Sequence, residues 1–185
     1  SIDDGENWQE MMSNLPHTPM YWIDIQEHFN DLVLGTYGRG IWILDDISPF
    51  QQINKSIIEK DIHLFNIKPS YRFHNVTSSL QMFPEASTGS DPPSGASINY
   101  WLKEKKEVEI IITNSDNDTI KTIKEDGVKG INRLWWDFQG ESTDEIILRT
   151  KPLYAEWVSL DKNRERKVPF ELSIMSPPGI YNVHL

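Results

Sequence analysis

Residues 30–46 read Asn-Asp-Leu-Val-Leu-Gly-Thr-Tyr-Gly-Arg-Gly-Ile-Trp-Ile-Leu-Asp-Asp, and this stretch decides the fold expected for the first part of the chain. It contains two short runs of branched and aromatic side chains, at 32–37 and 40–45, that are typical of β-strands. Asn-Asp at 30–31 and Gly-Arg-Gly at 38–40 bound these runs, because asparagine and glycine tolerate the backbone angles of tight turns. The stretch therefore predicts two strands and the turns that precede each of them.

The region before this stretch adds a third strand and a turn motif. Residues 20–26 (Met-Tyr-Trp-Ile-Asp-Ile-Gln) form another β-type run, and the chain begins Ser-Ile-Asp-Asp-Gly-Glu-Asn-Trp. The spacing of the Asp-box, S/T-x-D-x-G-x-x-W, is matched by Ser1, Asp3, Gly5 and Trp8. In such a turn a short acceptor holds backbone N–H groups, the glycine takes a positive φ, and the tryptophan packs beneath the loop. The motif is therefore given a structural role.

Together these patterns resemble a known family. The Asp-box is similar to the repeat of sialidase-like and sortilin-like β-propellers, and residues 30–46 resemble the last-blade segment of bacterial BNR-repeat glycosyl hydrolases, usually N-D-L-V-x-G-T-H-G-R-G/S-x-W-x-L-D-D. Tyr37 departs from that form, because the family commonly has His there, so no role of that His carries over. The resemblance implies that a fourth blade strand comes from the start of a longer, secreted, periplasmic or cell-surface chain, as propellers close their ring.

Residues 47–95 are interpreted as a connector and a loop. Pro49 and a polar run lead into a short strand at 61–65, and the following Pro-Ser-Tyr-Arg also resembles the family, whose connector reads D-x-x-L-F-x-x-x-P-x-Y-R. Ser, Thr, Pro and Gly are frequent in 75–95, a composition typical of loops.

Strict alternation of apolar residues begins after residue 95. Residues 98, 100 and 102 share one face of a predicted strand, and residues 108, 110 and 112 share one face of the next. A polar turn at 114–118 leads into a hairpin strand at 119–124, and 127–130 is another turn. The last two alternating sets are Leu134, Trp136 and Phe138, and then Tyr181, Val183 and Leu185. Short strands at this spacing, without helical periodicity between them, predict an antiparallel sandwich.

The family resemblance extends over this second part. P-P-x-G-A-x-I-x-Y-x-L at 92–102, G-I-N-R-L-x-W-D at 130–137 and P-G-I-Y-x-V-x-L at 178–185 match a C-terminal module similar to the immunoglobulin-like domain of flagellar hook-capping proteins, whereas residues 139–170 match poorly. The fold class expected is all-β. We predict a terminal propeller blade fragment at 1–46, a connector and loop at 47–95, and an immunoglobulin-like or fibronectin type III-like β-sandwich at 96–185.

Composition and charge exclude several function classes. The chain has no cysteine, which removes disulfides and thiolate zinc sites, and no apolar run that could span a bilayer. Its formal net charge is −10, which argues against a nucleic-acid partner. Residues 1–46 hold nine acids and one base, whereas residues 47–185 hold nineteen acids and seventeen bases. This step in charge indicates two structural units.

The sequence predicts no catalytic residue within the chain. Glycoside hydrolysis needs two carboxyl groups facing each other across roughly 5 to 9.5 Å. Asp45 and Asp46 cannot provide them together, because neighbouring side chains of a strand point to opposite faces. Arg39, between two glycines and close to Tyr37, is the best candidate for binding a ligand. The alternative, which we favour, is an arginine that pairs with carboxylates of its own blade.

Trp101, Trp135 and Trp157 are candidates for stacking on a sugar. Trp101 and Trp135 alternate away from the apolar faces assigned above, which would leave them partly exposed. A core or domain-junction role is the favoured alternative, because large aromatic residues of strands are more often packed. The five histidines show no metal-ligand spacing, so neither a metal nor a cofactor is expected.

The function predicted from these observations is that of a non-catalytic accessory module at the end of a secreted Asp-box propeller protein. Its expected partners are the rest of the propeller chain and either a glycan or another protein. Two alternatives stay open. The parent protein is a sialidase-like glycoside hydrolase whose catalytic residues lie mostly outside this chain, or it is a sortilin-like propeller that binds a protein ligand. The fold alone does not separate these functions.

Overall fold

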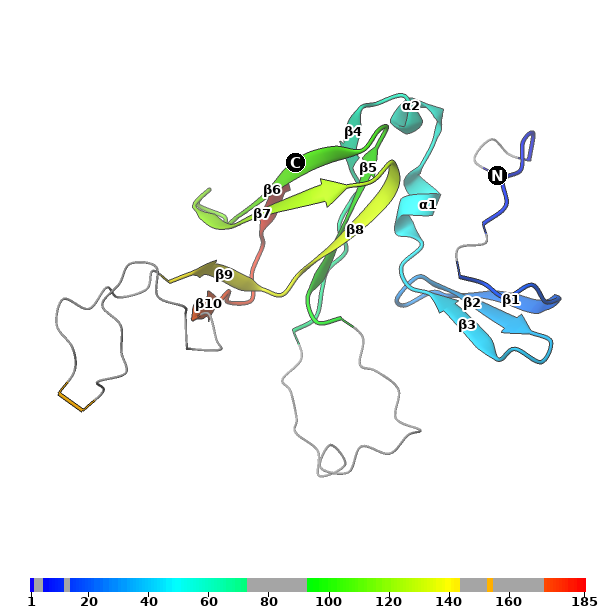
Figure 1. Ribbon diagram of the computed structural model, residues 1–185, viewed down its shortest axis with the longest axis horizontal. Coiled ribbons are helices and arrows are strands. Elements are labelled where there is room, and N and C mark those ends of the chain that lie inside the picture. Colours follow the sequence, from blue (N-terminus) through cyan, green and yellow to red (C-terminus); the bar gives the residue numbers. More distant parts are fainter. Residues whose placement is uncertain (2–4, 12–13, 73–92, 144–152, 155–171) are drawn as a thin grey trace. The chain divides into compact units, whose positions relative to one another are not determined.

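A computed structural model of the chain describes residues 1, 5–11, 14–72, 93–143, 153–154 and 172–185. These residues form several short antiparallel sheets and two short helices, so the expected all-β class is confirmed (Figure 1). The chain divides into two compact units, Ser1–Glu109 with Lys124–Asp137 and Leu185, and Ile110–Ile123 with Phe138–His184. Among the described residues, none of the helices combines the length and the apolar character needed to cross a membrane.

The first part of the chain forms a three-stranded antiparallel sheet, as predicted. Its strands are β1 (Met20–Gln26), β2 (Asp31–Thr36) and β3 (Ile41–Leu44), in the order β1-β2-β3. The predicted turns have the backbone angles that their residues favour, with φ of 60° at Asn30, 75° at Gly38 and 74° at Gly40. The Thr36 amide and hydroxyl both donate to the Gly40 carbonyl oxygen, at 3.2 and 2.6 Å, and close the second turn.

The connector is a packed structure with two helical turns that the sequence analysis did not predict. Helix α1 (Ser48–Gln52) has a proline in its first turn, and helix α2 (Lys55–Ile58) begins at Asn54, whose side-chain oxygen accepts the Ile57 amide at 3.1 Å. Both helices are too short to show a 3.6-residue apolar period. The predicted strand at 61–65 is present as β4 (Ile62–Leu64).

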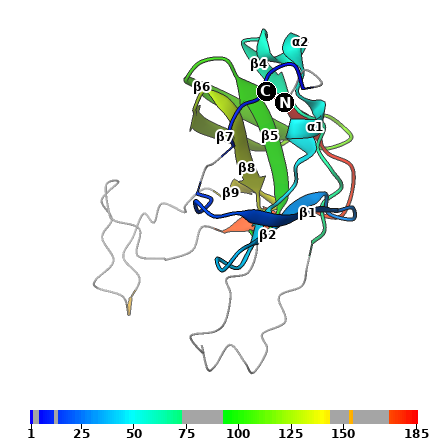
Figure 2. The same cartoon turned by 90° about the vertical axis from the view of Figure 1, so that its right-hand side faces the viewer.

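Strand β4 joins the second sheet, whose order is β4-β5-β8, and Figures 1 and 2 both show these strands side by side. The other two strands are β5 (Ala96–Leu102) and β8 (Gly130–Trp136). Ile98, Tyr100 and Leu102 are each 0% exposed, which confirms their predicted common face. The prediction for Phe138 was wrong, because β8 ends at Trp136 and Phe138 takes a left-handed φ of 63°.

One end of strand β7 covers the apolar face of β5. A Cβ atom added at Gly127, the last residue of β7, would lie 2.4 Å from Cδ1 of Leu102 and 3.2 Å from the Tyr100 hydroxyl oxygen. The Tyr100 hydroxyl group also donates to Glu125 at 3.3 Å. The end of β7 therefore packs closely on β5, with a glycine at the point of contact.

The third sheet has the order β11-β6-β7, and its strands are β6 (Lys106–Thr113), β7 (Thr119–Gly127) and β11 (Asn182–His184). Val108, Ile110 and Ile112 are 4%, 0% and 0% exposed, so their predicted shared face is confirmed. The polar turn at 114–118 is also confirmed. The Asn114 side-chain oxygen accepts the amides of Asp116 and Asp118, each at 2.9 Å.

A small two-stranded sheet completes the described structure. It pairs β9 (Gln139–Ser142) with β10 (Ser173–Met175). Most of the predicted loop at 75–95, most of the poorly matching region 139–170, and Trp157 fall outside the described residues. The domain boundaries predicted at residues 46 and 95 remain predictions.

Candidate functional site

The turn at the amino-terminal end of the chain contains a glycine of positive φ and a tryptophan that bonds back to it. Gly5 takes a φ of 93°, and its amide donates to the Ser1 hydroxyl oxygen at 2.8 Å. The Trp8 indole nitrogen donates to the Gly5 carbonyl oxygen at 3.1 Å, so the ring folds back onto the turn. Trp8 nevertheless remains 80% exposed. Asp3 lies outside the described residues, so its predicted role as an acceptor remains a prediction.

Tyr37 and Arg39 lie together on the hairpin between β2 and β3. The Tyr37 ring stacks on Tyr21 of β1, with ring centres 5.6 Å apart and planes inclined by 28°. The Tyr37 backbone is fixed on both sides, because its amide donates to Pro19 and its carbonyl oxygen accepts the Thr18 hydroxyl group. Arg39 is exposed, and the ion pairs among the described residues do not include it. The hairpin therefore presents an aromatic pair next to a cation.

Trp101 and Trp135 are half-buried on the face of the β4-β5-β8 sheet opposite to Tyr100. Trp135 lies across from Ser97, whereas Trp101 lies across from Ile131 and, on its other side, from His63. These two rows are four strand residues apart, or roughly 13 Å. The Asn99–Arg133 pair lies between them. The structure therefore does not bring the two tryptophans into one continuous stacking platform.

The β1–β3 sheet carries apolar side chains on both faces. Cross-strand pairing puts Ile23, Leu34 and Trp42 in one row on one face and Trp22, Gly35 and Ile41 in a neighbouring row on the other. Leu34 is buried, but Ile23, Trp22 and Ile41 are 65%, 71% and 73% exposed. An antiparallel sheet normally carries its apolar side chains on one face, which packs on the core, and polar side chains on the solvated face. Neither face of this sheet is thus fully covered by the described residues.

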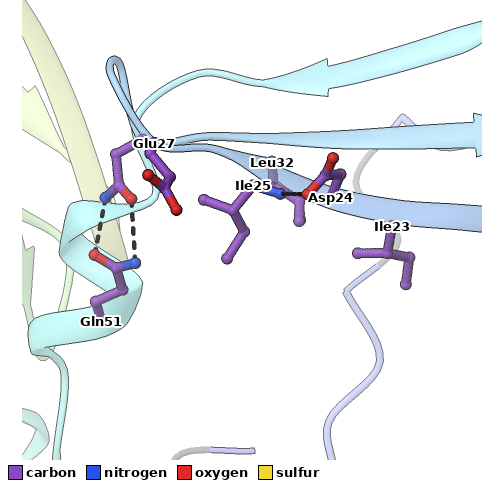
Figure 3. A pocket seen from close by; sticks show the side chains of 7 residues that line it. Ile23, Asp24, Ile25, Glu27, Leu32 and Gln51 are labelled. Carbon is purple, nitrogen blue, oxygen red and sulfur yellow. Dashed lines mark hydrogen bonds between the residues drawn. The ribbon is translucent and has the colours of Figure 1, made fainter.

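An open hollow of about 610 Å³ lies on one of these faces. Figure 3 shows Ile23, Ile25 and Glu27 projecting from β1 and its following turn toward the same side. Gln51 of α1 borders the hollow and is fixed there by two hydrogen bonds with Asn30, of 2.8 and 3.2 Å. The hollow is therefore lined by apolar side chains and by two carboxylates, those of Asp24 and Glu27, at the end of the sheet that meets the connector.

A partly buried polar cluster lies where β3 passes into the connector, and Asp46 is at its centre. One oxygen of the Asp46 carboxylate forms an ion pair with Lys68 Nζ at 2.8 Å and accepts the Ser48 hydroxyl group at 2.5 Å. The other oxygen accepts the Asn99 amide at 3.3 Å and the Ser97 hydroxyl group at 3.5 Å. The carboxylate is therefore bonded by the connector and by β5 at the same time.

The main chain of Asp46 is held in the same cluster. Its carbonyl oxygen accepts Arg133 of β8 at 2.9 Å, and its amide donates to the Asp31 carboxylate of β2 at 2.9 Å. Arg133 is itself positioned by Asn99, at 2.8 Å. Burial alone would raise the pKa of Asp46, but the Lys68 ammonium group and the hydrogen bonds from Ser48 outweigh it and lower that pKa below its ordinary value.

The sequence analysis considered Asp46 only as one of two neighbouring carboxylates of a strand and did not predict the cluster. Asp46 has a φ of 49°, and its partners on β5 and β8 lie 51 to 87 residues further along the chain. One signal could have pointed to them. Ser97, Asn99 and Arg133 are polar residues that alternate with buried apolar ones on two paired strands. Such a polar row on a half-buried face needs polar partners from another element.

Comparison with known proteins adds no relative to this description. No protein-family model, curated protein or solved structure matches the chain. Among the residues that the structure describes, no group of three or more His, Asp or Glu side chains is arranged to hold a metal ion. The candidate site consequently rests on the geometry of the β1–β3 sheet and of the Asp46 cluster.

Proposed function

We propose that this chain is a non-catalytic structural module of a larger Asp-box β-propeller protein. In this proposal the β1–β3 sheet is the terminal blade fragment, and the part after residue 95 is an immunoglobulin-like sandwich that extends the propeller. The whole protein would be secreted, periplasmic or attached to the cell surface. The observation that carries the proposal is the exposure of large apolar side chains on both faces of the β1–β3 sheet. Neighbouring blades would cover these faces in a propeller.

Burial of the exposed apolar side chains by neighbouring blades would contribute substantially to stability. Tyr21, Trp22, Ile41 and Ile43 are all more than 60% exposed. Complete burial of one such side chain stabilises a protein by about 1.5–3 kcal/mol. A sheet that evolved to face water on either side would not be expected to keep several of them, because large exposed apolar patches favour association. The hairpin with Tyr37 and Arg39 is the surface from which this module would contact a glycan or a protein.

The test compares the melting temperature of the 185-residue chain with that of the complete protein that contains it. Trp22→Ser and Ile41→Ser remove side chains that are 71% and 73% exposed in this chain, so we expect little change in its own melting temperature. In the complete protein each substitution should lower the melting temperature by several degrees, because the side chain would be buried between blades. Equal, small shifts in both proteins would contradict the proposal.

A matched control and an activity assay complete the test. Lys105→Ser, on an exposed position after β5, should leave both melting temperatures unchanged. Hydrolysis of chromogenic glycosides by the complete protein, abolished by Arg39→Ala without a change in melting temperature, would contradict the non-catalytic assignment. Hydrolysis that Arg39→Ala does not affect, or no hydrolysis by either protein, agrees with the assignment.

A further inference from the structure

The connector after β3 holds the β1–β3 sheet at two points that are far apart in sequence. The first point is Asp46, which follows β3. The second is the turn between β1 and β2, where the Phe29 carbonyl oxygen accepts Lys68 Nζ at 2.8 Å. Lys68 also forms the ion pair with Asp46 at 2.8 Å. A single ammonium group therefore ties the end of β3 to the β1–β2 turn.

Residues of the connector form further hydrogen bonds with the turn between β1 and β2. The Asn30 side-chain Nδ2 donates to the Ser48 hydroxyl oxygen at 3.1 Å, and the side chains of Asn30 and Gln51 exchange two hydrogen bonds. The Ile47 amide donates to the Asn30 carbonyl oxygen at 2.9 Å. Helix α1 is thus bonded to the same turn that Lys68 holds. Pro49 of this helix is fully buried, so the helix is packed as well as hydrogen-bonded.

The same cluster reaches the β5–β8 pair. Asn99 and Ser97 donate to the Asp46 carboxylate, and Arg133 donates to its main-chain oxygen. The charged groups that face Asp46 are Lys68 from the segment after β4, Arg133 from β8 and Asp31 from β2. The side chain of Asp46 is 16% exposed and that of Lys68 is 37% exposed, so the ion pair is partly shielded from water.

Asp46 also adopts a backbone conformation that a flexible linker would not hold. Its φ of 49° is left-handed, which costs about 1–2 kcal/mol for a residue with a Cβ atom. Such conformations persist where the surrounding contacts fix them. Here the amide, the carbonyl oxygen and both carboxylate oxygens are all bonded, to four different parts of the chain. The left-handed turn aims the carboxylate and the carbonyl oxygen at their partners simultaneously.

We propose that Asp46 and Lys68 clamp the end of the β1–β3 sheet to the β5–β8 strands, so that the connector is a rigid joint and not a hinge. A rigid joint would give the β4-β5-β8 sheet a fixed orientation on the blade. This inference rests on the proposed function, because a fixed orientation is useful only to a module that extends a larger assembly. The groups that Asp46 and Lys68 bond to belong to the same chain, and each of these bonds lies within one compact unit.

The experiment measures the distance distribution between two spin labels by pulsed electron paramagnetic resonance. The labels are attached at Arg39→Cys, on the hairpin remote from Asp46, and at Glu104→Cys, in the exposed turn after β5. The chain has no cysteine of its own, so labelling is specific. We expect one narrow distribution in the otherwise unchanged chain. Asp46→Ala and Lys68→Met should each broaden it at least twofold.

Asp45→Ala is the matched control, because it removes the same charge from the neighbouring, exposed position and should leave the distribution narrow. Near-ultraviolet circular dichroism of each variant checks that the sandwich core is folded. A distribution that stays narrow in both clamp variants would overturn the proposal, and so would a broad distribution in the unchanged chain. Either outcome leaves the proposed function standing, since that function is tested separately by the melting temperature of the complete protein.

Discussion

Gly127→Ala should destabilise the sandwich, although alanine is ordinarily favoured over glycine. The new Cβ atom would lie 2.4 Å from Leu102 Cδ1 and 3.2 Å from the Tyr100 hydroxyl oxygen, and both of these side chains are fully buried. Overpacking of a core costs about 1–3 kcal/mol. Replacing glycine by alanine also lowers the conformational entropy of the unfolded chain, which stabilises the folded state by about 0.4–1 kcal/mol. We therefore expect the free energy of unfolding to fall by about 1–2 kcal/mol.

Urea titration followed by tryptophan fluorescence measures this change. Gly140→Ala is the control, because the nearest atom to its added Cβ is 3.4 Å away, and it should leave the free energy of unfolding equal or slightly higher. Leu102→Ala removes the clashing methyl group. In that background Gly127→Ala should cost nothing further, which gives a coupling energy of about 1–2 kcal/mol. A free energy of unfolding that Gly127→Ala leaves unchanged would refute the packing of β7 on β5.

Three further outcomes are expected. Burial and the Glu125 carboxylate raise the pKa of Tyr100 to about 12, so the stability that this phenol contributes is complete below pH 10 and is lost as the pH rises toward 12; absorbance at 295 nm should show one high-pH tyrosine that Tyr100→Phe removes. The pKa of Asp46 is lowered, so its stabilising effect is present above about pH 4 and is lost as the pH falls; Asp46→Asn should flatten urea midpoints measured across this acid range. Asn54→Ala removes the cap of α2 and should lower the free energy of unfolding by about 1 kcal/mol, measured by urea titration, and a midpoint equal to that of the unchanged chain would contradict the capping role.

Local patterns predicted most of the strands because each strand's alternation is visible in its own residues. The spacing of Ile98, Tyr100 and Leu102 alone predicts a shared buried face, and all three are completely buried in the structure. Turns were equally readable, since Asn30 and Gly38 hold the positive φ that their residue types favour. The strand β8 was overextended to Phe138 because apolar alternation continues in the sequence after the backbone turns away.

The connector and the Asp46 cluster could not be predicted in the same way. Helices of four and five residues leave no periodic signal, and only Asn54 and Pro49 hint at where they begin. The cluster joins residues that are up to 87 positions apart, so its geometry depends on how β5, β8 and the connector pack. The flanking glycines of Arg39 make it a candidate for ligand binding from sequence alone. Arg133, which bonds to Asp46, has no neighbouring residues that indicate its role.

The β1–β3 sheet is central to the account, since we regard it as a part that lacks its natural cover. Hydrogen exchange of backbone amides in the 185-residue chain tests this claim most directly, with Val33 and Leu34 of β2 compared with Ile98 of β5 and Ile110 of β6. We predict that the β2 amides exchange at least about 100-fold faster, because a sheet with two incompletely covered faces opens locally before the sandwich unfolds. Equal protection of β2 and β5 would contradict the account.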